Sequence, residues 1–355
     1  MLAWYQAHKR DLAWRDSGDP YRIWVSEIML QQTRVDQMGG YFARFIAAFP
    51  TVQDLAQAQE SQVLKAWEGL GYYARARNLQ KAARRIVAEY GGQIPDTYEQ
   101  LIDLPGVGQY TAAAVSSIAF DRDHPVLDGN VARFLCRLLR IEEDPAKSAT
   151  KAQLIRAGEI LLVRGQAGHF NQAMMELGSR VCTPTQPRCG GCPVEPWCRA
   201  RREMEDPSQL PNKAPKKKKP HFQVAAGVIW KEGQVLIAQR PSEGMLGGLW
   251  EFPGGKQEPD ESLEECLVRE IREELDFTIA VDQHLVTVEH GYSHFSITLH
   301  AFNARYVEGE PRPIGCQDWR WIEPETLDDF AFPRADRKVI EFLRQQAQQM
   351  DLFGG

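Results

Sequence analysis

Four cysteines stand close together in the sequence and could hold a metal centre. They lie in a stretch rich in proline and glycine, so the backbone can fold around one compact point: Cys182, Cys189, Cys192 and Cys198. Thiolates at such spacings bind either a tetrahedral zinc ion or an iron–sulfur cluster, and the residue types alone do not decide between them. The three other cysteines of the seven are isolated, which argues against a disulfide framework.

A second group suited to metal chemistry consists of three glutamates. Glu270, Glu273 and Glu274 are spaced to lie one turn apart on one face of a helix predicted over Leu263–Glu274. Carboxylates in this arrangement could hold Mg²⁺ against a pyrophosphate. A solvated acidic helix face is the simpler alternative.

Glu27 is a candidate acid. It lies within Trp24–Thr33 and is followed by Ile28, Met29 and Leu30. A glutamate on an apolar helical face has a raised pKa, so its carboxyl stays protonated and can donate to a leaving group. The alternative is an ordinary surface glutamate.

The segment Leu104–Gly108 is suited to binding a phosphate. Gly106 and Gly108 allow the backbone to approach an anion, and the helix expected from Thr111 presents free amides to it. An ordinary turn between helices is the alternative. Asp128 follows Gly108 by twenty residues and precedes another helix, where an aspartate commonly caps the helix N-terminus.

Two kinds of structure must position these residues. From Asp11 to about Met204 the 3.6-residue periodicity predicts short helices, among them Val52–Trp67, Ala74–Tyr90, Thr111–Phe120 and Asn130–Arg140. Beyond Pro220 the sequence predicts strands and two helices: Val224–Trp230, Gln234–Gln239, Leu263–Glu274, Ser296–Tyr306, Asp318–Ile322 and Lys338–Gln346. We therefore expect an all-α domain at 1–204 and an α+β domain at 221–355, with the cysteine loop at 182–198.

Residues 205–220 have the composition of a linker, with four prolines and five lysines. The run Lys216–Lys219 is either a solvated charge cluster or a contact to a phosphate backbone. The division between the domains is predicted here.

Composition fits a globular protein, with 43% hydrophobic and 25% charged residues among 355. The net charge of −6 is uneven, because residues 220–355 carry 12 Lys and Arg against 24 Asp and Glu. Average charge neither supports nor excludes DNA binding, which depends on local contacts. No signal peptide or membrane span is indicated, so we expect a cytoplasmic protein.

Residues 1–200 resemble the adenine DNA glycosylase (MutY) family. The cysteine spacing is similar to the cluster loop of endonuclease III and MutY glycosylases, and Leu104–Gly108 resembles their helix-hairpin-helix element. The resemblance implies a [4Fe–4S] cluster on the four cysteines. It implies a monofunctional glycosylase that removes adenine mispaired with 8-oxoguanine or guanine in base excision repair, acting as a monomer on double-stranded DNA in the bacterial cytoplasm, near the nucleoid.

Roles for the central residues follow from the same resemblance. Glu27 is the general acid, and Asp128 stabilises the oxocarbenium-like sugar, with Asn130 and Tyr110 assisting. Lyase-type relatives carry a lysine at the position of Tyr110. Because a phenol cannot form a Schiff base, we expect base removal without efficient strand cleavage.

Chemistry on a base within a duplex requires that the base be extruded. Tyr72, within Gly69–Leu79, and Gln32 match family segments that contact the lesion. Gln172 is expected to read the adenine edge through its amide. Two further residues, matching the family's Pro-Trp-Arg with Ala13 in place of proline, are expected in the same pocket: Trp14 and Arg15.

The C-terminal half carries the pattern of a Nudix box, from Gly255 through Glu261 to Arg269–Glu274, with Asp276 in place of the final glycine. Residues 222–346 resemble MutT, an 8-oxo-dGTP hydrolase. Asp336 stands where an asparagine is expected to read the oxidised base, so the resemblance leaves nucleotide choice open. The box is either catalytic, with Mg²⁺, or a retained element of the fold.

In MutY proteins this domain serves lesion recognition. The resemblance assigns the contact with 8-oxoguanine to three consecutive residues, Tyr292, Ser293 and His294. Two other functions compete with the glycosylase hypothesis: a nucleotide pyrophosphohydrolase that carries a DNA-binding module, and a non-enzymatic damage sensor. Glu27, Asp128 and Gln172 are all present, which favours the glycosylase.

Overall fold

A computed structural model describes residues 1–15, 18–212 and 218–353 of the protein. The chain forms two compact units. The first consists of Met1–Gln57 and Asn78–Lys216, and the second of Ala58–Arg77 and Lys217–Gly355. Residues 213–217 of the predicted linker, with part of its lysine run, lie outside the described residues. The segment Ala58–Arg77 thus groups with the C-terminal part of the chain, although it precedes most of the helical unit in sequence.

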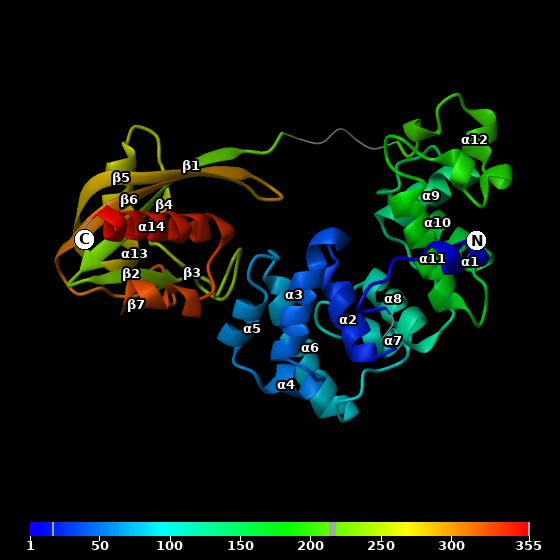
Figure 1. The fold of residues 1–355 in the computed structure, drawn as a ribbon, viewed down its shortest axis with the longest axis horizontal. Helices are drawn as coiled ribbons and strands as arrows, with labels where there is room; N and C mark the ends of the chain where they lie inside the picture. The colour runs from blue at the N-terminus through cyan, green and yellow to red at the C-terminus, as the bar shows by residue number, and fades with distance from the viewer. Residues whose placement is uncertain (16–17, 213–217, 354–355) are drawn as a thin grey trace. The chain divides into compact units, whose positions relative to one another are not determined.

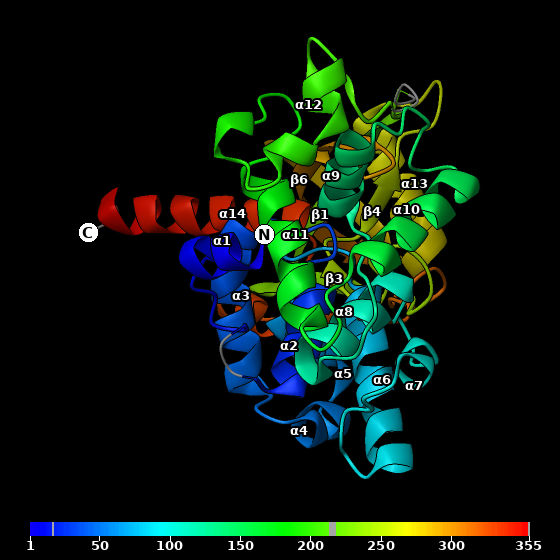
Figure 2. The same cartoon turned by 90° about the vertical axis from the view of Figure 1, so that its right-hand side faces the viewer.

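The first unit is helical. Its elements are α1 (Leu2–His8), α2 (Pro20–Met29), α3 (Val35–Ala48), α4 (Val52–Gln57), most of α6 (Ala74–Tyr90), α7 (Tyr98–Ile102), α8 (Gln109–Phe120), α9 (Gly129–Leu139), α10 (Ser148–Leu161), α11 (Ala167–Arg180), α12 (Arg199–Glu203) and the short 3₁₀ turns η1 (Cys189–Gly191), η2 (Glu195–Trp197) and η3 (Pro207–Gln209). Helix α11 packs against α1, α8 and α9, and α2 packs against α8 (Figure 2).

Sequence features explain where the central helices begin and which helices are buried. Asp19 accepts a hydrogen bond from the Tyr21 amide, and Pro20 opens α2 with a backbone angle already suited to a helix. Helix α8 is buried along much of its length because its side chains are mostly small. Helices α2 and α11 can therefore pack closely against it, which holds the residues they carry in fixed positions.

The second unit contains a seven-stranded mixed sheet in the order β3-β2-β1-β6-β5, with β4 paired to β1 and β7 to β2. Its strands are β1 (His221–Lys231), β2 (Gln234–Gln239), β3 (Trp250–Glu251), β4 (Gly254–Lys256), β5 (Thr278–Gly291), β6 (Ser296–Glu308) and β7 (Asp318–Ile322). Strands β1 and β6 are parallel, and β5 and β6 form a long antiparallel pair.

One helix packs on each face of this sheet (Figure 1). Helix α13 (Leu263–Leu275) buries Leu267 and Ile271 against one face, and α14 (Arg334–Phe353) buries Val339 and Ile340 against the other. The unit also contains α5 (Glu60–Ala66), from the segment Ala58–Arg77, and the 3₁₀ turn η4 (Pro324–Asp329).

The elements differ from the sequence predictions in several places, among them the unpredicted short strands β3 and β4 and the greater length of α14, and two of the differences have a clear cause. The single helix predicted over Val52–Trp67 is divided into α4 and α5, because Gln59 and Gln62 form a capping box that starts a new helix. Strand β5 was not predicted, because its burial pattern is irregular and its pairing with β6 shifts register at bulges. No helix among the described residues is long and apolar enough to cross a membrane.

Candidate functional site

A pocket of about 320 Å³ in the first unit collects most of the residues predicted to act in base removal. Its lining includes Glu27 from α2, Tyr110 from α8, and Asp128 and Asn130 at the start of α9. Three elements distant in sequence therefore meet around one cavity. The volume lies at the lower end of the range for small-molecule sites, about 300–1,000 Å³.

Glu27 is nearly inaccessible to solvent, with 5% of its surface exposed, yet it lines this pocket. Burial raises the pKa of its carboxyl, and the negative charge of Asp128 raises it further. The hydrogen bond from Tyr110 and the positive charge of Arg15 act in the opposite direction, lowering the pKa. An acid in this environment keeps its proton to a higher pH than an exposed glutamate and can deliver it within the pocket.

Tyr110 is the direct partner of Glu27. Its hydroxyl donates to Glu27 Oε2 at 2.8 Å and lies 3.4 Å from the sulfur of Met175. Burial, more than the neighbouring carboxyls, raises the pKa of the Tyr110 phenol well above its usual value. The phenol therefore stays protonated and orients the acid.

Asp128 is held rigidly. One carboxyl oxygen accepts from the Val131 amide at 2.6 Å, which confirms the predicted cap of α9, and the other accepts from Asn130 Nδ2 at 3.0 Å. The Asn130 amide oxygen in turn accepts from Arg133 at 2.9 Å. This chain of bonds fixes the direction in which the Asp128 carboxyl points.

Arg15 also lines the pocket, as predicted from the family pattern, and Arg10 lines it beside Arg15. Both guanidinium groups bind Glu176 on α11, whose side chain is fully buried. The sequence analysis did not single out Arg10 or Glu176. A signal was available, because an acidic residue between Met174 and Leu177 on a buried helix requires a cationic partner.

Two residues predicted for the adenine pocket do not line it. Gln172 faces Tyr5, whose hydroxyl donates to its amide oxygen at 3.1 Å, and its amide nitrogen donates to the Gly168 carbonyl at 3.2 Å. Its hydrogen-bonding groups are used within the core, and its role in reading adenine stays a prediction. Trp14 is also buried outside the lining, packed edge-on against Phe42.

The residues predicted to touch DNA outside the pocket are exposed or lie at helix starts. Gln32 is exposed at the pocket rim with a positive φ of 60°. Gly106 also has a positive φ, 76°, and a Cβ there would stand 2.6 Å from Asn78, so both conformation and space require glycine. Gly108 precedes α8 without a side-chain cap, which leaves the first amides of that helix available.

Within the second unit, two residues predicted to contact the lesion lie together. Tyr72, 40% exposed, and Ser293, in the turn between β5 and β6, contact each other through their hydroxyls. His294 is exposed beside Ser293 in this turn, and Tyr292 packs against Phe295 and His290. These residues come from segments more than 200 positions apart in the sequence.

The four clustered cysteines line one small cavity of about 20 Å³. Two buried arginines of α9 hold the loop around it. Arg137 donates to the carbonyls of Thr183 and Pro184 at 2.7 Å and lies 3.4 Å from the Cys182 sulfur, while Arg133 donates to the Cys182 carbonyl at 2.8 Å. In the described part of the chain, no three His, Cys, Asp or Glu side chains converge in the geometry of a metal site.

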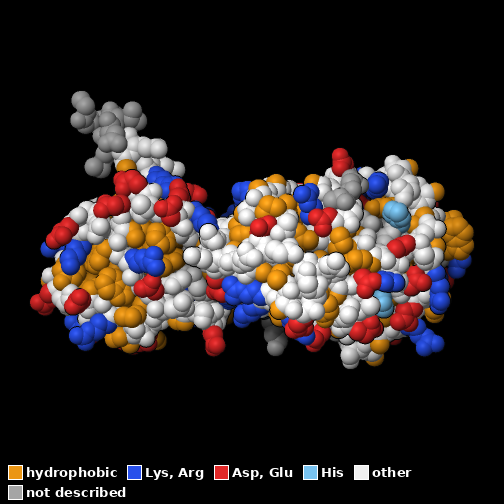
Figure 3. All heavy atoms as spheres, turned by 90° about the horizontal axis from the view of Figure 1, so that it is seen from below, with side chains coloured by type: hydrophobic (Ala, Val, Ile, Leu, Met, Phe, Trp, Pro, Cys, Tyr) orange, Lys and Arg blue, Asp and Glu red, His pale blue; other side chains and the backbone are white. Residues whose placement is uncertain are grey.

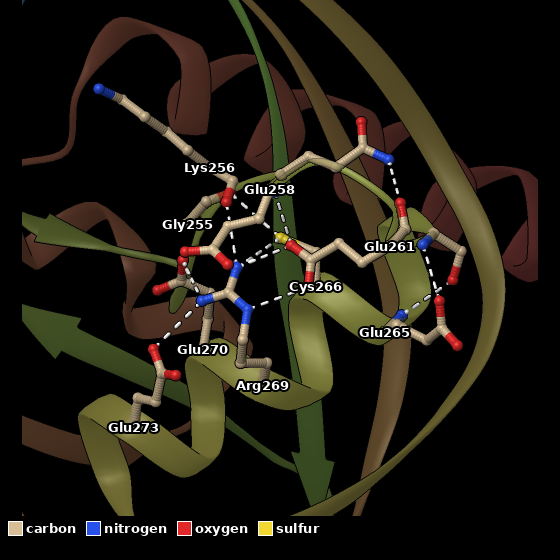
Figure 4. A network of polar contacts seen from close by, with 11 residues as sticks. Gly255, Lys256, Glu258, Glu261, Glu265, Cys266, Arg269, Glu270 and Glu273 are labelled. Carbon is tan, nitrogen blue, oxygen red and sulfur yellow. Dashed lines mark hydrogen bonds and ion pairs between the residues drawn. The ribbon is translucent and has the colours of Figure 1, made fainter.

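The predicted Nudix glutamates are divided between two environments. Figure 4 shows Glu270 and Glu273, which both bind Arg269. Glu270 and Glu274 line a groove of about 330 Å³, and a Cβ on Gly255 would collide with the Glu270 carboxyl. Glu273 does not line it: its carboxyl is 60% exposed and binds Arg269 at 3.1 Å. Arg269 also binds Glu261 and Glu270, so the arginine occupies the centre of this acidic cluster.

The groove itself contains acids with strongly raised pKa values. Burial raises the pKa of Glu274 to about 7 and that of Asp336 to about 8. Asp336 is buried, and one of its carboxyl oxygens accepts from the Phe252 amide at 3.1 Å. Burial also raises the pKa of Glu251, which binds Arg240 at 2.6 Å. Of the three predicted metal ligands, only Glu270 and Glu274 line this groove, and Glu273 does not.

The helical pocket and the sheet together define a DNA-repair glycosylase joined to a Nudix fold. Residues 25–158 match the HhH-GPD superfamily of base excision DNA repair proteins, and residues 225–342 match the NUDIX domain. A solved structure of a thermostable thymine-DNA glycosylase is 28% identical, with a TM-score of 0.51, covering 57% of this chain and 94% of its own.

Full-length relatives identify the family more narrowly. The human adenine DNA glycosylase is 37% identical over 401 residues, which span 98% of this chain and 73% of that protein. The adenine DNA glycosylase of Mycobacterium tuberculosis is 40% identical over 212 residues, covering 59% of this chain and 69% of its own. The chain belongs to the adenine DNA glycosylase family and is an enzyme of base excision repair.

Proposed function

We propose that this enzyme hydrolyses the bond between adenine and deoxyribose where adenine is paired with 8-oxoguanine or guanine in double-stranded DNA, and that it acts without cleaving the strand. The observation that carries the proposal is the buried Glu27 carboxyl, which has a raised pKa and faces the same pocket as the fixed carboxylate of Asp128. One acid that holds a proton and one oriented anion are what cleavage of an N-glycosidic bond requires.

In the proposed reaction Glu27 donates its proton to a ring nitrogen of adenine. The bond between the sugar C1′ and the base nitrogen breaks, and its electron pair leaves with the protonated base. Asp128 stabilises the positive charge that develops on the sugar. Water then adds its oxygen to C1′ and releases a proton, which restores Glu27. Tyr110 keeps the Glu27 carboxyl aimed into the pocket throughout.

The absence of an amine at position 110 supports the second half of the proposal. Cleavage of the strand by β-elimination starts from an imine between an amine and the sugar C1′, and a phenol cannot form one. Tyr110 donates its hydroxyl to Glu27 instead, so its role is to position an acid. The expected product is an abasic site in an intact strand.

We also propose that Cys182, Cys189, Cys192 and Cys198 hold a [4Fe–4S] cluster. Their common cavity, and the positive Arg137 beside the Cys182 sulfur, suit the binding of thiolates to a metal centre. When bound, the cluster would hold the two ends of the loop between α11 and α12 together. The chain's own contribution is the set of carbonyls held by Arg133 and Arg137, which shape the loop independently.

Contacts with DNA are proposed from local features, because the face drawn in Figure 3 mixes basic and acidic side chains. The amides that begin α8, after Gly106 and Gly108, suit a phosphate. Gln32 at the pocket rim and Tyr72 in the second unit are each proposed to contact DNA at the mispair. Tyr292, Ser293 and His294 are proposed to distinguish 8-oxoguanine from guanine; for Ser293, the contact with Tyr72 supports this.

A second activity, weak hydrolysis of nucleoside triphosphates with Mg²⁺, is favoured by one observation. The Glu270 and Glu274 carboxyls line one groove with the Gly255 backbone, and carboxylates are ligands that Mg²⁺ accepts. We propose that this activity is separate from adenine removal.

The two activities can be tested on the intact protein. Adenine release is measured on duplexes that differ only in the base opposite adenine: 8-oxoguanine, guanine or thymine. Nucleotide hydrolysis is measured with 8-oxo-dGTP and Mg²⁺. The proposal predicts release opposite 8-oxoguanine and guanine and almost none opposite thymine. Failure to release adenine from any duplex would overturn it, whatever the nucleotide assay shows.

A further inference from the structure

Glu176 is a buried charge at the back of the proposed active site, and none of the roles described above uses it. Its side chain is fully buried on α11 and does not line the pocket. Both of its oxygens accept hydrogen bonds from Arg10 Nε, at 3.0 and 3.1 Å, and one also accepts from Arg15 at 2.6 Å. A buried carboxylate is stable only when paired in this way.

The two arginines, unlike Glu176, do line the pocket. Arg10 is about one quarter exposed and Arg15 about one eighth, and they share the pocket lining with Glu27 and Asp128. Both come from the segment after α1, which has no regular structure of its own at these positions. Glu176 is therefore a fixed point on a packed helix to which two long, otherwise adaptable side chains are attached.

The pairing of Glu176 with Arg15 bears on the pKa of Glu27. The charged or titratable groups that act on Glu27 are Tyr110 from α8, Arg15 from the segment after α1, and Asp128 at the start of α9. Arg10 lines the pocket beside Arg15, and Glu176 binds both arginines. Arg15 lowers the pKa of Glu27, which works against a general acid. A negative charge 2.6 Å from Arg15 offsets part of that effect.

We propose that Glu176 is a positioning residue for adenine release: it holds the guanidinium groups of Arg10 and Arg15 at the pocket wall and offsets their charge next to the Glu27 carboxyl. The arginines can then face a polar base while their positive charge does less to favour loss of the Glu27 proton. This inference rests on the proposed role of Glu27, and its test is designed to separate the two.

The test is the pH dependence of single-turnover adenine release from an adenine:8-oxoguanine duplex. In the unaltered protein the rate falls as pH rises through the pKa of Glu27. Glu176→Gln preserves shape but leaves two positive charges uncompensated, so the midpoint of this fall moves to lower pH by about one unit. Above the midpoint that shift corresponds to a rate about tenfold lower.

Two further variants distinguish charge from packing. Glu176→Asp keeps the negative charge and returns the midpoint toward that of the unaltered protein. Glu176→Gln combined with Arg15→Met removes one uncompensated charge and moves the midpoint back up, even if the maximal rate stays low. A purely structural role for Glu176 would lower the rate equally at every pH.

The outcomes are separable. If the unaltered protein releases adenine with an alkaline fall in rate, and folded Glu176→Gln shows the same midpoint, the role of Glu176 is excluded while the function stands. If Glu176→Gln does not fold, the Glu176→Asp midpoint decides, and a value unlike that of the unaltered protein would exclude the charge role. If the unaltered protein releases no adenine, the proposed function itself fails.

Discussion

Two pockets among the described residues have almost equal volumes, about 320 Å³ in the helical unit and about 330 Å³ in the Nudix unit, and both include acids with raised pKa values. Their surroundings differ. In the helical pocket one acid, Glu27, is hydrogen-bonded to a phenol, and the nearby arginines are compensated by Glu176. In the Nudix groove several carboxyls converge; Glu251 binds the partly exposed Arg240, and Glu270 binds Arg269.

This difference distinguishes a site that controls one proton from a site with an excess of negative charge. In the helical pocket, Asp128 is oriented by a backbone amide and Asn130, and burial raises the pKa of Glu27. In the Nudix groove, the raised pKa values of Glu274 and Asp336 show that protons relieve the repulsion and desolvation. A bound cation could relieve them as well.

The largest effect is expected at the helical pocket. Glu27→Gln and Asp128→Asn each lower the single-turnover rate of adenine release by about a thousandfold or more, because they remove acidity or charge needed in the transition state. Affinity for the mispaired duplex changes little. Rates like those of the unaltered protein in either variant would contradict the mechanism. Tyr110→Phe is the matched comparison: it keeps both acids, so its loss is smaller.

The next effect separates the two pockets. Glu270→Gln lowers nucleoside triphosphate hydrolysis at least about a hundredfold and leaves adenine release unchanged, because the two sites share no residue. Glu273→Gln shows whether the exposed carboxyl bound to Arg269 is also needed. If the unaltered protein hydrolyses no normal or oxidised nucleotide, the groove is a feature of the fold without this chemistry.

How far the sequence predicted these sites depends on the range of the interactions. The bounds of α6, β2 and β7 were predicted correctly because periodicity and turn residues are local signals. The link between Glu176 and Arg10 joins residues 166 positions apart and was missed. Local motifs cannot show which distant group a side chain will meet.

Gln172 illustrates the same limit. The motif around it places an amide on α11, yet the sequence does not reveal that the Tyr5 hydroxyl will donate to this amide. Glu273 is a parallel case, since helical spacing puts it near Glu270 but does not predict that its exposed carboxyl will bind Arg269. Glu27 was the easier inference, because burial of its side chain follows from a strongly apolar helix, whereas its partner Tyr110, 83 positions away, does not.

A moderate effect on stability is expected at Asp336. Its pKa is about 8 in the folded protein against a usual 3.8, so burial favours the protonated form. The stability that protonated Asp336 contributes is therefore fully present below its usual pKa of 3.8 and is lost as pH rises through about 8. Asp336→Asn keeps an acceptor for the Phe252 amide and removes this loss. Near pH 8 we expect a gain of about 2 kcal/mol, roughly 4–8 °C in the unfolding temperature of that unit.

Thermal unfolding of both proteins at acidic and alkaline pH measures this difference. The two curves should nearly coincide at low pH and separate as pH rises. A constant separation at every pH would mean that the substitution acts through packing, and that Asp336 does not titrate in this range.

The smallest effect concerns lesion discrimination. Ser293→Ala combined with His294→Ala reduces the preference for 8-oxoguanine over guanine opposite adenine by about tenfold, because hydroxyl and imidazole contacts with the oxidised base are lost. The rate of the chemical step, measured when all of the duplex is bound by enzyme, stays the same. An unchanged ratio of rates for the two duplexes would mean that the turn between β5 and β6 does not read the lesion.

In the proposed reaction this protein releases adenine by acid catalysis and leaves the strand intact. The most direct test follows free adenine and strand cleavage together in one reaction on an adenine:8-oxoguanine duplex, with and without subsequent alkali. We expect adenine to appear at the full single-turnover rate and strand breaks to appear only after alkali, since Tyr110 offers no amine. Strand breaks formed without alkali as fast as adenine is released, or no adenine at all, would contradict it.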